Sequence, residues 1–489
     1  MDNSLKTDLQ AQAEAYEKFG QTYSRAGDFV SALDSLQKAL VLRKEIGDIV
    51  GESQVLNNIG KVYLRQGDYE TALTYFKQSL MMGQQIGDKV GESAVLNNIS
   101  AIYRAQGDYE TALAYLKQSL AIQQQLGDKF GEGRTLNNLS QIYDALGDYE
   151  TALAYLKQSL AISQQIGDKV GESATLNNLG QIYRVQGDYE TALAYLKQSM
   201  AISQQIGDKA GESATLNNIG QIYHAQGDYE TALAYLKQSL AISQQIGDKA
   251  GEGTTLNNIA QIFQAQGDYE TALAYLKQSL AIRQQIGDKA GESATLNNIG
   301  QICRAQGDYE TALAYLQQSL AISQQIGDKA GESATLNNIG QIYHVQGDYE
   351  TALAYLKQSL AISQQIGDKA GEGTTLNNIA QIFQAQGDYE TALNYLKLSL
   401  TISQQIGDKA GLCISLFNIG YIHAENKDIK EAISAWITVY VIAKQIGLAQ
   451  PLQVLAQLAP QLGMSPGLEG WEALAKKVSD SNRVIGGDI

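Results

Sequence analysis

The sequence predicts an all-α protein made of repeated helix pairs, and three observations support that prediction. The 489-residue chain has no proline before Pro451, so no proline interrupts a helix in its first 450 residues. The strong helix formers Ala, Leu, Gln, Lys and Glu dominate the composition. A Gly-Asp pair or a close variant returns every 40 residues from Gly27 to Asp428, and the segments between are near copies. A fixed period of this length is typical of a solenoid, in which each repeat contacts its neighbours.

Each 40-residue unit contains two Gly-Asp pairs, as at Gly227-Asp228 and Gly247-Asp248. Glycine can adopt the left-handed conformation after a helix, and aspartate caps the following helix by accepting backbone N–H bonds. Two-residue connections between helices of about 18 residues place neighbouring helices antiparallel. The chain is therefore expected to form eleven helical hairpins.

The apolar spacing within a unit predicts how its two helices pack. Leu216 and Ile219 begin a helical stripe in the first helix, and Ala232 belongs to a second stripe in the next. The position of Gly220 holds only Gly, Ala or Ser in all eleven units. A larger side chain would overpack this contact, so Ala260→Ile is expected to break the stacking of neighbouring units.

Composition excludes several classes of function. The net charge is −16, the pI is near 4.7, and the acidic residues are spread over the repeats, which argues against nucleic acid or an anionic membrane as partner. Cys303 and Cys413 lie in different repeats and are expected to be reduced thiols. The N-terminus has no apolar run of the signal-peptide type. These features predict a cytoplasmic protein without a membrane segment.

The repeated segment LNNIGQIYxxQGDYETALAYLKQSL resembles the tetratricopeptide repeat over residues 8–446, eleven copies in all. It lacks the usual closing proline, and its period is 40 rather than 34 residues. This 40-residue form resembles the Pins/LGN spindle-orientation adaptors, kinesin light chain and long bacterial arrays. The resemblance implies a right-handed α-α superhelix of about eleven hairpins.

The two ends of the chain differ from the repeats. Residues 1–7 are expected to form an N-terminal tail, and residues 481–489 a flexible C-terminal tail. Residues 447–480 carry Leu455 and Trp471 within apolar helical patterns. They are expected to form capping helices that cover the last exposed stripe of the array.

The resemblance implies that the first helix of each pair lines a concave groove. Amides recur there, and the Pins/LGN family binds partner peptides through such asparagines. Basic side chains concentrate in repeats two to five and can bind carboxylates. The predicted peptide-binding residues are the amides Asn57, Asn97, Asn137, Asn177, Asn217, Asn257, Asn297, Asn337, Asn377, Gln141, Gln181 and Gln221, and the cations Lys61, Arg65, Arg104, Arg134 and Arg184. The competing interpretations are structural bonding by the amides and solvated arginines that raise solubility.

The sequence gives no support for catalysis. His224, His344 and His423 fall in separate units, and no Cys/His cluster has metal-ligand spacing. The glycine-rich phosphate loops are also missing. We expect no enzymatic activity, no cofactor, no metal and no small-molecule substrate.

These features predict an adaptor that binds an extended, partly acidic polypeptide in its groove. One alternative is a structural spacer or self-assembling scaffold, because near-identical units cannot specify a register for a non-repetitive ligand. Another is the sensor partner of a separate effector, such as a caspase-like protease or a transcription factor. A monomer is expected under the first hypothesis, and self-association under the second.

Overall fold

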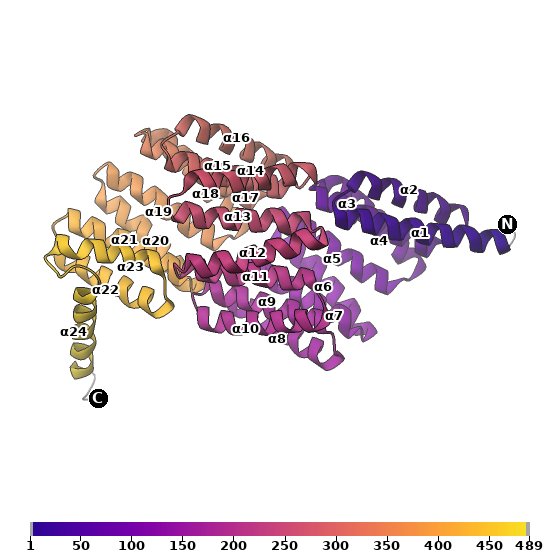
Figure 1. The fold of residues 1–489 in the computed structure, drawn as a ribbon, viewed down its shortest axis with the longest axis horizontal. Helices are drawn as coiled ribbons and strands as arrows, with labels where there is room; N and C mark the ends of the chain where they lie inside the picture. The colour runs from indigo at the N-terminus through magenta and orange to yellow at the C-terminus, as the bar shows by residue number, and fades with distance from the viewer. Residues whose placement is uncertain (1–2, 486–489) are drawn as a thin grey trace. The chain divides into compact units, whose positions relative to one another are not determined.

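The computed structural model describes residues 3–485, and this range contains α-helices and one short 3-10 helix but no strand. It is an all-α solenoid, as the sequence predicts (Figure 1). In chain order the elements are α1 (Asn3–Ala26), α2 (Phe29–Glu45), α3 (Ile49–Gln66), α4 (Tyr69–Ile86), α5 (Lys89–Ala105), α6 (Tyr109–Leu126), α7 (Lys129–Ala145), α8 (Tyr149–Ile166), α9 (Lys169–Val185), α10 (Tyr189–Ile206), α11 (Lys209–Ala225), α12 (Tyr229–Ile246), α13 (Lys249–Ala265), α14 (Tyr269–Gln285), α15 (Lys289–Ala305), α16 (Tyr309–Ile326), α17 (Lys329–Val345), α18 (Tyr349–Ile366), α19 (Lys369–Ala385), α20 (Tyr389–Ile406), α21 (Lys409–Glu425), α22 (Ile429–Ile446), α23 (Ala449–Leu458), η1 (Ala459–Leu462) and α24 (Glu469–Ile485).

The chain divides into two compact units. Unit 1 comprises Met1–Asn178, Lys197–Asn217 and Tyr235–Thr335, and unit 2 comprises Leu179–Leu196, Asn218–Ala234 and Leu336–Ile489. Helix α1 begins at Asn3, so the expected tail 1–7 is largely helical in the structure. The expected tail 481–489 overlaps α24 up to Ile485, and 486–489 lie outside the described residues.

The connections between helices use the predicted glycine and aspartate chemistry. At the turn after α3, Gly67 has φ 77°, and the Asp68 carboxylate accepts a hydrogen bond of 3.1 Å from Thr71 N. Left-handed glycine ends one helix, and the aspartate satisfies an orphan N–H of the next. From α1 to α22 the connections are two or three residues long, so successive helices of the array run antiparallel.

Small residues permit close packing inside each hairpin. In unit 2, a Cβ on Gly180 would lie 2.6 Å from Leu196 Cγ, and in unit 1 a Cβ on Gly300 would lie 2.8 Å from Leu316 Cγ. Ala260, at the same position in its repeat, is buried. The predicted restriction to Gly, Ala and Ser therefore has a direct steric cause.

The C-terminal elements cover the end of the array in unit 2. Trp471 of α24 is fully buried against Trp436 of α22, with ring centroids 6.3 Å apart and perpendicular planes. Its indole N–H donates to Leu455 O at 2.8 Å, so the one polar atom of this buried ring has a partner. Helices α23 and α24 thus shield an apolar core from water, as a finite stack requires.

Turns that are six repeats apart also pack against each other within each unit. We call the connection inside a repeat the QGDY turn, after its Gln-Gly-Asp-Tyr sequence, and the connection between repeats the IGD turn, after Ile-Gly-Asp; close variants keep these names. In unit 1 the QGDY turn of repeat 1 contacts the IGD turn of repeat 7, since a Cβ on Gly27 would lie 2.9 Å from Ile286 Cγ2. In unit 2 a Cβ on Gly187 of repeat 5 would lie 3.1 Å from Ile446 Cδ1 of repeat 11.

The same arrangement recurs with the adjacent residues. The Tyr69 side chain of repeat 2 packs in a cluster with Ile326 of repeat 8, and the carboxylates of Asp288 and Asp328 lie close enough to act on it. Burial, followed by these two charges, raises the pKa of Tyr69 to about 12. Each QGDY turn of this kind fits between two successive IGD turns. We call this packing the seam.

Candidate functional site

The recurring asparagines form a hydrogen-bonded ladder between repeats. In unit 1 the second asparagine of one repeat donates to the first asparagine of the preceding repeat, as Asn98 Nδ2 does to Asn57 Oδ1 at 2.8 Å and Asn138 Nδ2 to Asn97 Oδ1 at 2.9 Å. Asn97 Nδ2 in turn donates to Thr135 Oγ1 at 2.9 Å in the next repeat. Both ends of the first amide are therefore engaged by neighbouring helices.

The ladder continues along the array. Equivalent bonds between asparagines join Asn178 to Asn137 at 2.8 Å, Asn258 to Asn217 at 3.0 Å and Asn378 to Asn337 at 2.9 Å. A buried amide without partners would be costly, and in these pairs the second asparagine satisfies the oxygen of the first. Asn257 Oδ1 is an exception, a buried acceptor with no partner among the described residues. The asparagines consequently have a structural role in joining successive first helices.

Access to the first asparagine changes along the chain. Four of these side chains are half-buried, and the remaining predicted ones are buried. The half-buried group is Asn57, Asn97, Asn137 and Asn177, and the buried group is Asn217, Asn257, Asn297, Asn337 and Asn377. The ladder uses one of the two acceptor positions of Asn57 Oδ1, whereas Asn97 Oδ1 accepts from both Asn138 Nδ2 at 2.9 Å and Thr135 Oγ1 at 3.3 Å.

Two predicted cations meet at one cavity of unit 1, beside the accessible asparagines. A hollow of about 350 Å³ is lined by Lys61, Arg134, Asn97, Asn98 and Asn138, among others. Both cationic side chains are exposed to solvent, and among the described residues neither forms an ion pair with a carboxylate. Burial of the Lys61 ammonium lowers its pKa, and the nearby Arg134 guanidinium lowers it further, although the side chain as a whole keeps solvent contact.

Three residues that sequence analysis missed line the same cavity. Phe130 lies under the Arg134 guanidinium, and Arg134 Cζ is 5.8 Å from the centroid of the Phe130 ring. Gln123 is buried, and its Oε1 has no hydrogen-bond partner among the described residues. Asp128 also borders the space, where its Oδ1 caps a helix by accepting from Gly131 N at 2.9 Å. Comparison of the repeats could have found Gln123 and Phe130, because the next unit has Ser163 and Val170 instead.

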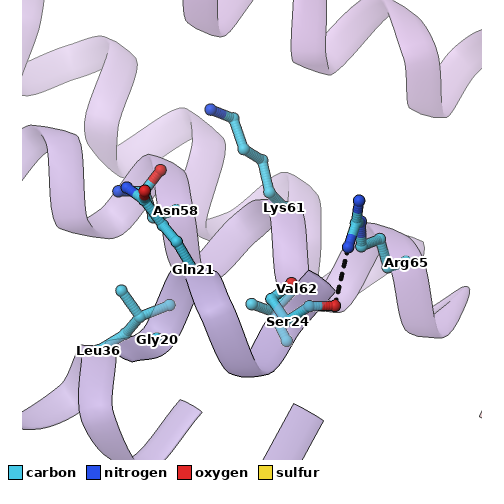
Figure 2. A pocket seen from close by; sticks show the side chains of 8 residues that line it. All are labelled: Gly20, Gln21, Ser24, Leu36, Asn58, Lys61, Val62 and Arg65. Atoms are coloured by element: carbon cyan, nitrogen blue, oxygen red, sulfur yellow. Dashed lines mark hydrogen bonds between the residues drawn. The ribbon is translucent and has the colours of Figure 1, made fainter. Parts of the chain in front are cut away.

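A second hollow adjoins Lys61 on its other side. Figure 2 shows its lining, in which the Asn58 and Gln21 amides lie together and the Lys61 side chain extends away from the other residues drawn. The Arg65 Nη1 donates to the backbone oxygen of Ser24 at 2.8 Å, which holds that guanidinium beside the hollow. Lys61 therefore borders two hollows along the first helices of repeats 1 to 4.

The other predicted arginines have different surroundings. Arg104 of unit 1 lies near Tyr69 and Tyr109 at the QGDY turns, and burial lowers its pKa. Arg184 of unit 2 lies near Tyr189. The structure thus does not place Arg104 with Lys61 and Arg134.

The predicted glutamines are all partly accessible. Gln141 belongs to unit 1, whereas Gln181 and Gln221 belong to unit 2. The structure does not bring them together with the cavity of Lys61 and Arg134.

The remaining chemistry-bearing groups show no further site among the described residues. No cluster of three or more His, Cys, Asp or Glu side chains in this range could hold a metal ion. Cys303 and Cys413 are buried free thiols, and burial raises the pKa of Cys413 to about 12. None of the described helices is both long and apolar enough to cross a membrane.

Comparison with known proteins identifies the class. The tetratricopeptide repeat family matches residues 11–85, 91–165, 171–245, 251–325, 291–365, 331–405 and 371–436. The chain therefore belongs to the tetratricopeptide repeat family, whose members are generally non-enzymatic scaffolds for protein interactions. None of the curated proteins compared matches the chain.

The solved structures that match this chain include two Rap proteins and a phosphatase. A Rap protein complexed with competence and sporulation factor is 16% identical, with a TM-score of 0.53 over 73% of this chain and 98% of that one. The apo form of RapI is 20% identical, with a TM-score of 0.45 over 56% of this chain and 98% of that one. Aspartyl phosphate phosphatase F from Bacillus subtilis is 16% identical, with a TM-score of 0.47 over 74% and 94%. At this identity the first of these likenesses supports the solenoid fold alone.

Proposed function

We propose that this protein is a non-enzymatic adaptor that binds an extended, partly acidic polypeptide along the first helices of repeats 1 to 4. The observation that carries the proposal is the cavity where Lys61 and Arg134 meet without carboxylate partners beside the accessible asparagines. The Arg134 guanidinium adds to the lowering of the Lys61 pKa, and an incoming carboxylate would relieve the repulsion between the two charges. A Rap protein in complex with competence and sporulation factor has the same fold, which is consistent with a peptide ligand.

The polar groups around the cations suit a main chain. Gln123 Oε1 is a buried acceptor without a partner, and a peptide N–H can satisfy it. Asn57 Oδ1 accepts one hydrogen bond in the ladder and keeps a position for a second donor. Phe130 supports the Arg134 guanidinium from below, which orders it for binding a carboxylate. Backbone recognition by amides and acid recognition by cations would together accept many sequences that are rich in Asp or Glu.

Asparagine substitutions are a poor test of this proposal, because the ladder makes them affect stacking as well as binding. Charge reversal is cleaner. We expect Lys61→Glu/Arg134→Glu to weaken binding of a fluorescent oligoglutamate peptide at low salt by tenfold or more in anisotropy titrations. The matched control is Lys157→Glu/Lys197→Glu, which makes the same charge change on exposed second-helix positions. An affinity that is the same in the two double variants would overturn the proposal.

The predicted contribution of Arg104 and Arg184 can be tested separately. The two lie near tyrosines at the QGDY turns, so we expect Arg104→Glu/Arg184→Glu to weaken binding less than the Lys61/Arg134 pair does. Peptide affinity at low salt, measured in the same anisotropy assay, ranks the pairs. If the Arg104/Arg184 pair had the larger effect, the site would lie at the turns and not at the cavity.

A further inference from the structure

The seam uses only part of the turn surface that the chain offers. In unit 1, repeats 1 and 2 insert their QGDY turns against the IGD turns of repeats 7 and 8. This packing buries Ile286 and Ile326, which are 7% and 6% exposed. The QGDY turn of repeat 3 is also covered, since Gln106 Nε2 would lie 3.4 Å from a Cβ on Gly327 of repeat 8, but other turns of the same sequence in this unit are exposed.

The unpaired QGDY turns are those of repeats 7 and 8. Gly267 and Gly307 have φ 80° and 82°, the same conformation as Gly27, yet none of the described residues lies within 4 Å of a Cβ built there. The Ala-Gln-Gly-Asp stretches at 265–268 and 305–308 are fully exposed. The backbone shape that fits the seam is therefore preformed and uncovered in these two turns.

The unpaired IGD turns of repeats 2 to 5 also belong to unit 1. Their apolar residues are Ile86, Leu126, Ile166 and Ile206, which are exposed by 37%, 46%, 41% and 38%. They follow one another at intervals of 40 residues and form three successive gaps between turns. Each gap presents the residues that receive a QGDY turn elsewhere in the same unit.

We propose that these two surfaces bind each other between copies of this chain, so that the QGDY turns of repeats 7 and 8 of one copy insert between the IGD turns of repeats 2 to 5 of another. The contact repeats, residue for residue, the packing already present within the molecule. The second copy is the occupant because it carries the complementary turn at the same 40-residue spacing. An unrelated partner would have to reproduce both the spacing and the glycine conformation.

This contact joins two different surfaces, so each copy keeps one surface of each kind open unless the two copies make the contact reciprocally. Contacts of this kind extend into chains of molecules unless a rotation closes them into a ring. Each inserted turn covers one half-exposed isoleucine or leucine, and the small apolar area of such a contact makes a single insertion weak. Two turns inserting together gain from multivalency, and we expect association at micromolar to millimolar concentrations.

The first test is the mass of the protein in solution. In a sedimentation-velocity series from low to high concentration, the weight-average mass of the wild type should rise to at least twice the monomer mass. The variant Leu126→Asp/Ile166→Asp/Ile206→Asp should remain monomeric, because it places charges in all three gaps. The control Val41→Asp/Met81→Asp/Leu398→Asp makes the same charge change at apolar residues of second helices that are more exposed than the gap residues, and it should associate like the wild type. A wild type that stays monomeric, or a control that fails like the gap variant, would overturn the proposal.

The second test locates the contact. A photo-crosslinking amino acid at Gln306 should join two copies, and the crosslinked peptide should contain an IGD turn of repeats 2 to 5. A mixture of isotope-labelled and unlabelled chains distinguishes links between copies from links within one copy. Crosslinks that join copies through other surfaces would show that association does not use these turns. The groove residues take no part in this contact, so Lys61→Glu/Arg134→Glu should associate normally.

Discussion

Two IGD turns of unit 1 have the same sequence and opposite surroundings. Ile166 of repeat 4 is 41% exposed, whereas Ile326 of repeat 8 is 6% exposed. The difference comes from the QGDY turn of repeat 2, which covers Ile326. A Cβ built on Gly67 of that turn would lie 3.7 Å from Ile326 Cγ2. A residue's environment in this molecule thus depends on its place along the array as well as on its repeat.

The comparison separates two kinds of stabilisation. Contacts inside a hairpin and between adjacent hairpins are similar in the near-identical repeats, so they give these repeats a similar local stability. Seam contacts join residues about 260 positions apart and exist only where two turns of the array meet. Closing so long a segment costs chain entropy that local contacts do not, and the seam must offset that cost with burial. Because the repeats are nearly identical, a substitution at a seam position can be compared with the same substitution at the equivalent exposed position of another repeat.

The largest difference is expected from placing a charge at the two isoleucines. Ile326→Asp buries a carboxylate among apolar atoms and should destabilise the seam by about 3 kcal/mol, either by desolvation or by opening the contact. Ile166→Asp keeps its charge in water and should change stability by less than about 0.5 kcal/mol. Hydrogen exchange in α3 and α4, compared between the two variants, measures the effect on the covering repeat. Equal protection in both variants would mean that repeats 2 and 8 do not pack together.

A smaller difference is expected from the glycines of two QGDY turns. Gly27 and Gly267 both have φ 80°, so alanine should cost each about 1 kcal/mol of backbone strain. At Gly27 the new methyl group also meets Ile286 Cγ2 at 2.9 Å, and overpacking adds about 1–3 kcal/mol. Urea denaturation of the two alanine variants, each against the wild type, gives the comparison. The seam contact of repeat 1 would be refuted by a Gly27→Ala midpoint that equals the Gly267→Ala midpoint.

The sequence predicted the contacts within a repeat and between adjacent repeats. It did not predict the contacts between repeats that are six positions apart in the array. Helix pairs, caps and the small residue at Gly180 follow from spacing and steric rules that act within 40 residues. The seam follows from a small rotation per repeat that adds up over six repeats, and no local pattern encodes that sum. Buried Ile326 and exposed Ile166 therefore look identical in the sequence.

The candidate site shows the same limit. Sequence analysis identified Lys61, Arg134 and the asparagines, but it could not tell that Asn98 would donate to Asn57 in the preceding repeat. An amide at this position suits a ligand or a neighbouring helix equally well, and only the distance between the helices decides. Arg104 was expected with Lys61 among the groove cations of repeats two to five, yet it lies near Tyr69. Side-chain direction at the end of a helix is set by the turn that follows.

The smallest expected effect is a pH dependence of the seam. Burial raises the pKa of Asp328, although backbone N–H groups of Gly331 and Ala330 oppose the shift. The contribution of Asp328 to the free energy of unfolding is therefore complete below the ordinary aspartate pKa. It is lost as pH rises through the pKa that Asp328 has in the folded protein. Hydrogen bonds from Thr271 lower the pKa of the exposed cap Asp268, so its contribution is lost as pH falls. The two carboxylates should respond to acid with opposite signs.

Acidification from neutral pH should thus strengthen the seam beside Asp328 while it weakens the cap at Asp268. The groups that face Asp328 are Tyr69 from α4, which stays neutral in this range, and Glu332 on its own helix, with Arg104 beyond Tyr69. Asp328→Asn keeps a capping side chain and removes the charge, so protection of the amides at 66–69 should rise at neutral pH and lose its dependence on acid. Asp268→Asn should leave those amides unchanged. If Asp328→Asn kept the wild-type pH response of hydrogen exchange, the response would belong to another group, and burial of Asp328 by the turn of repeat 2 would have no energetic consequence.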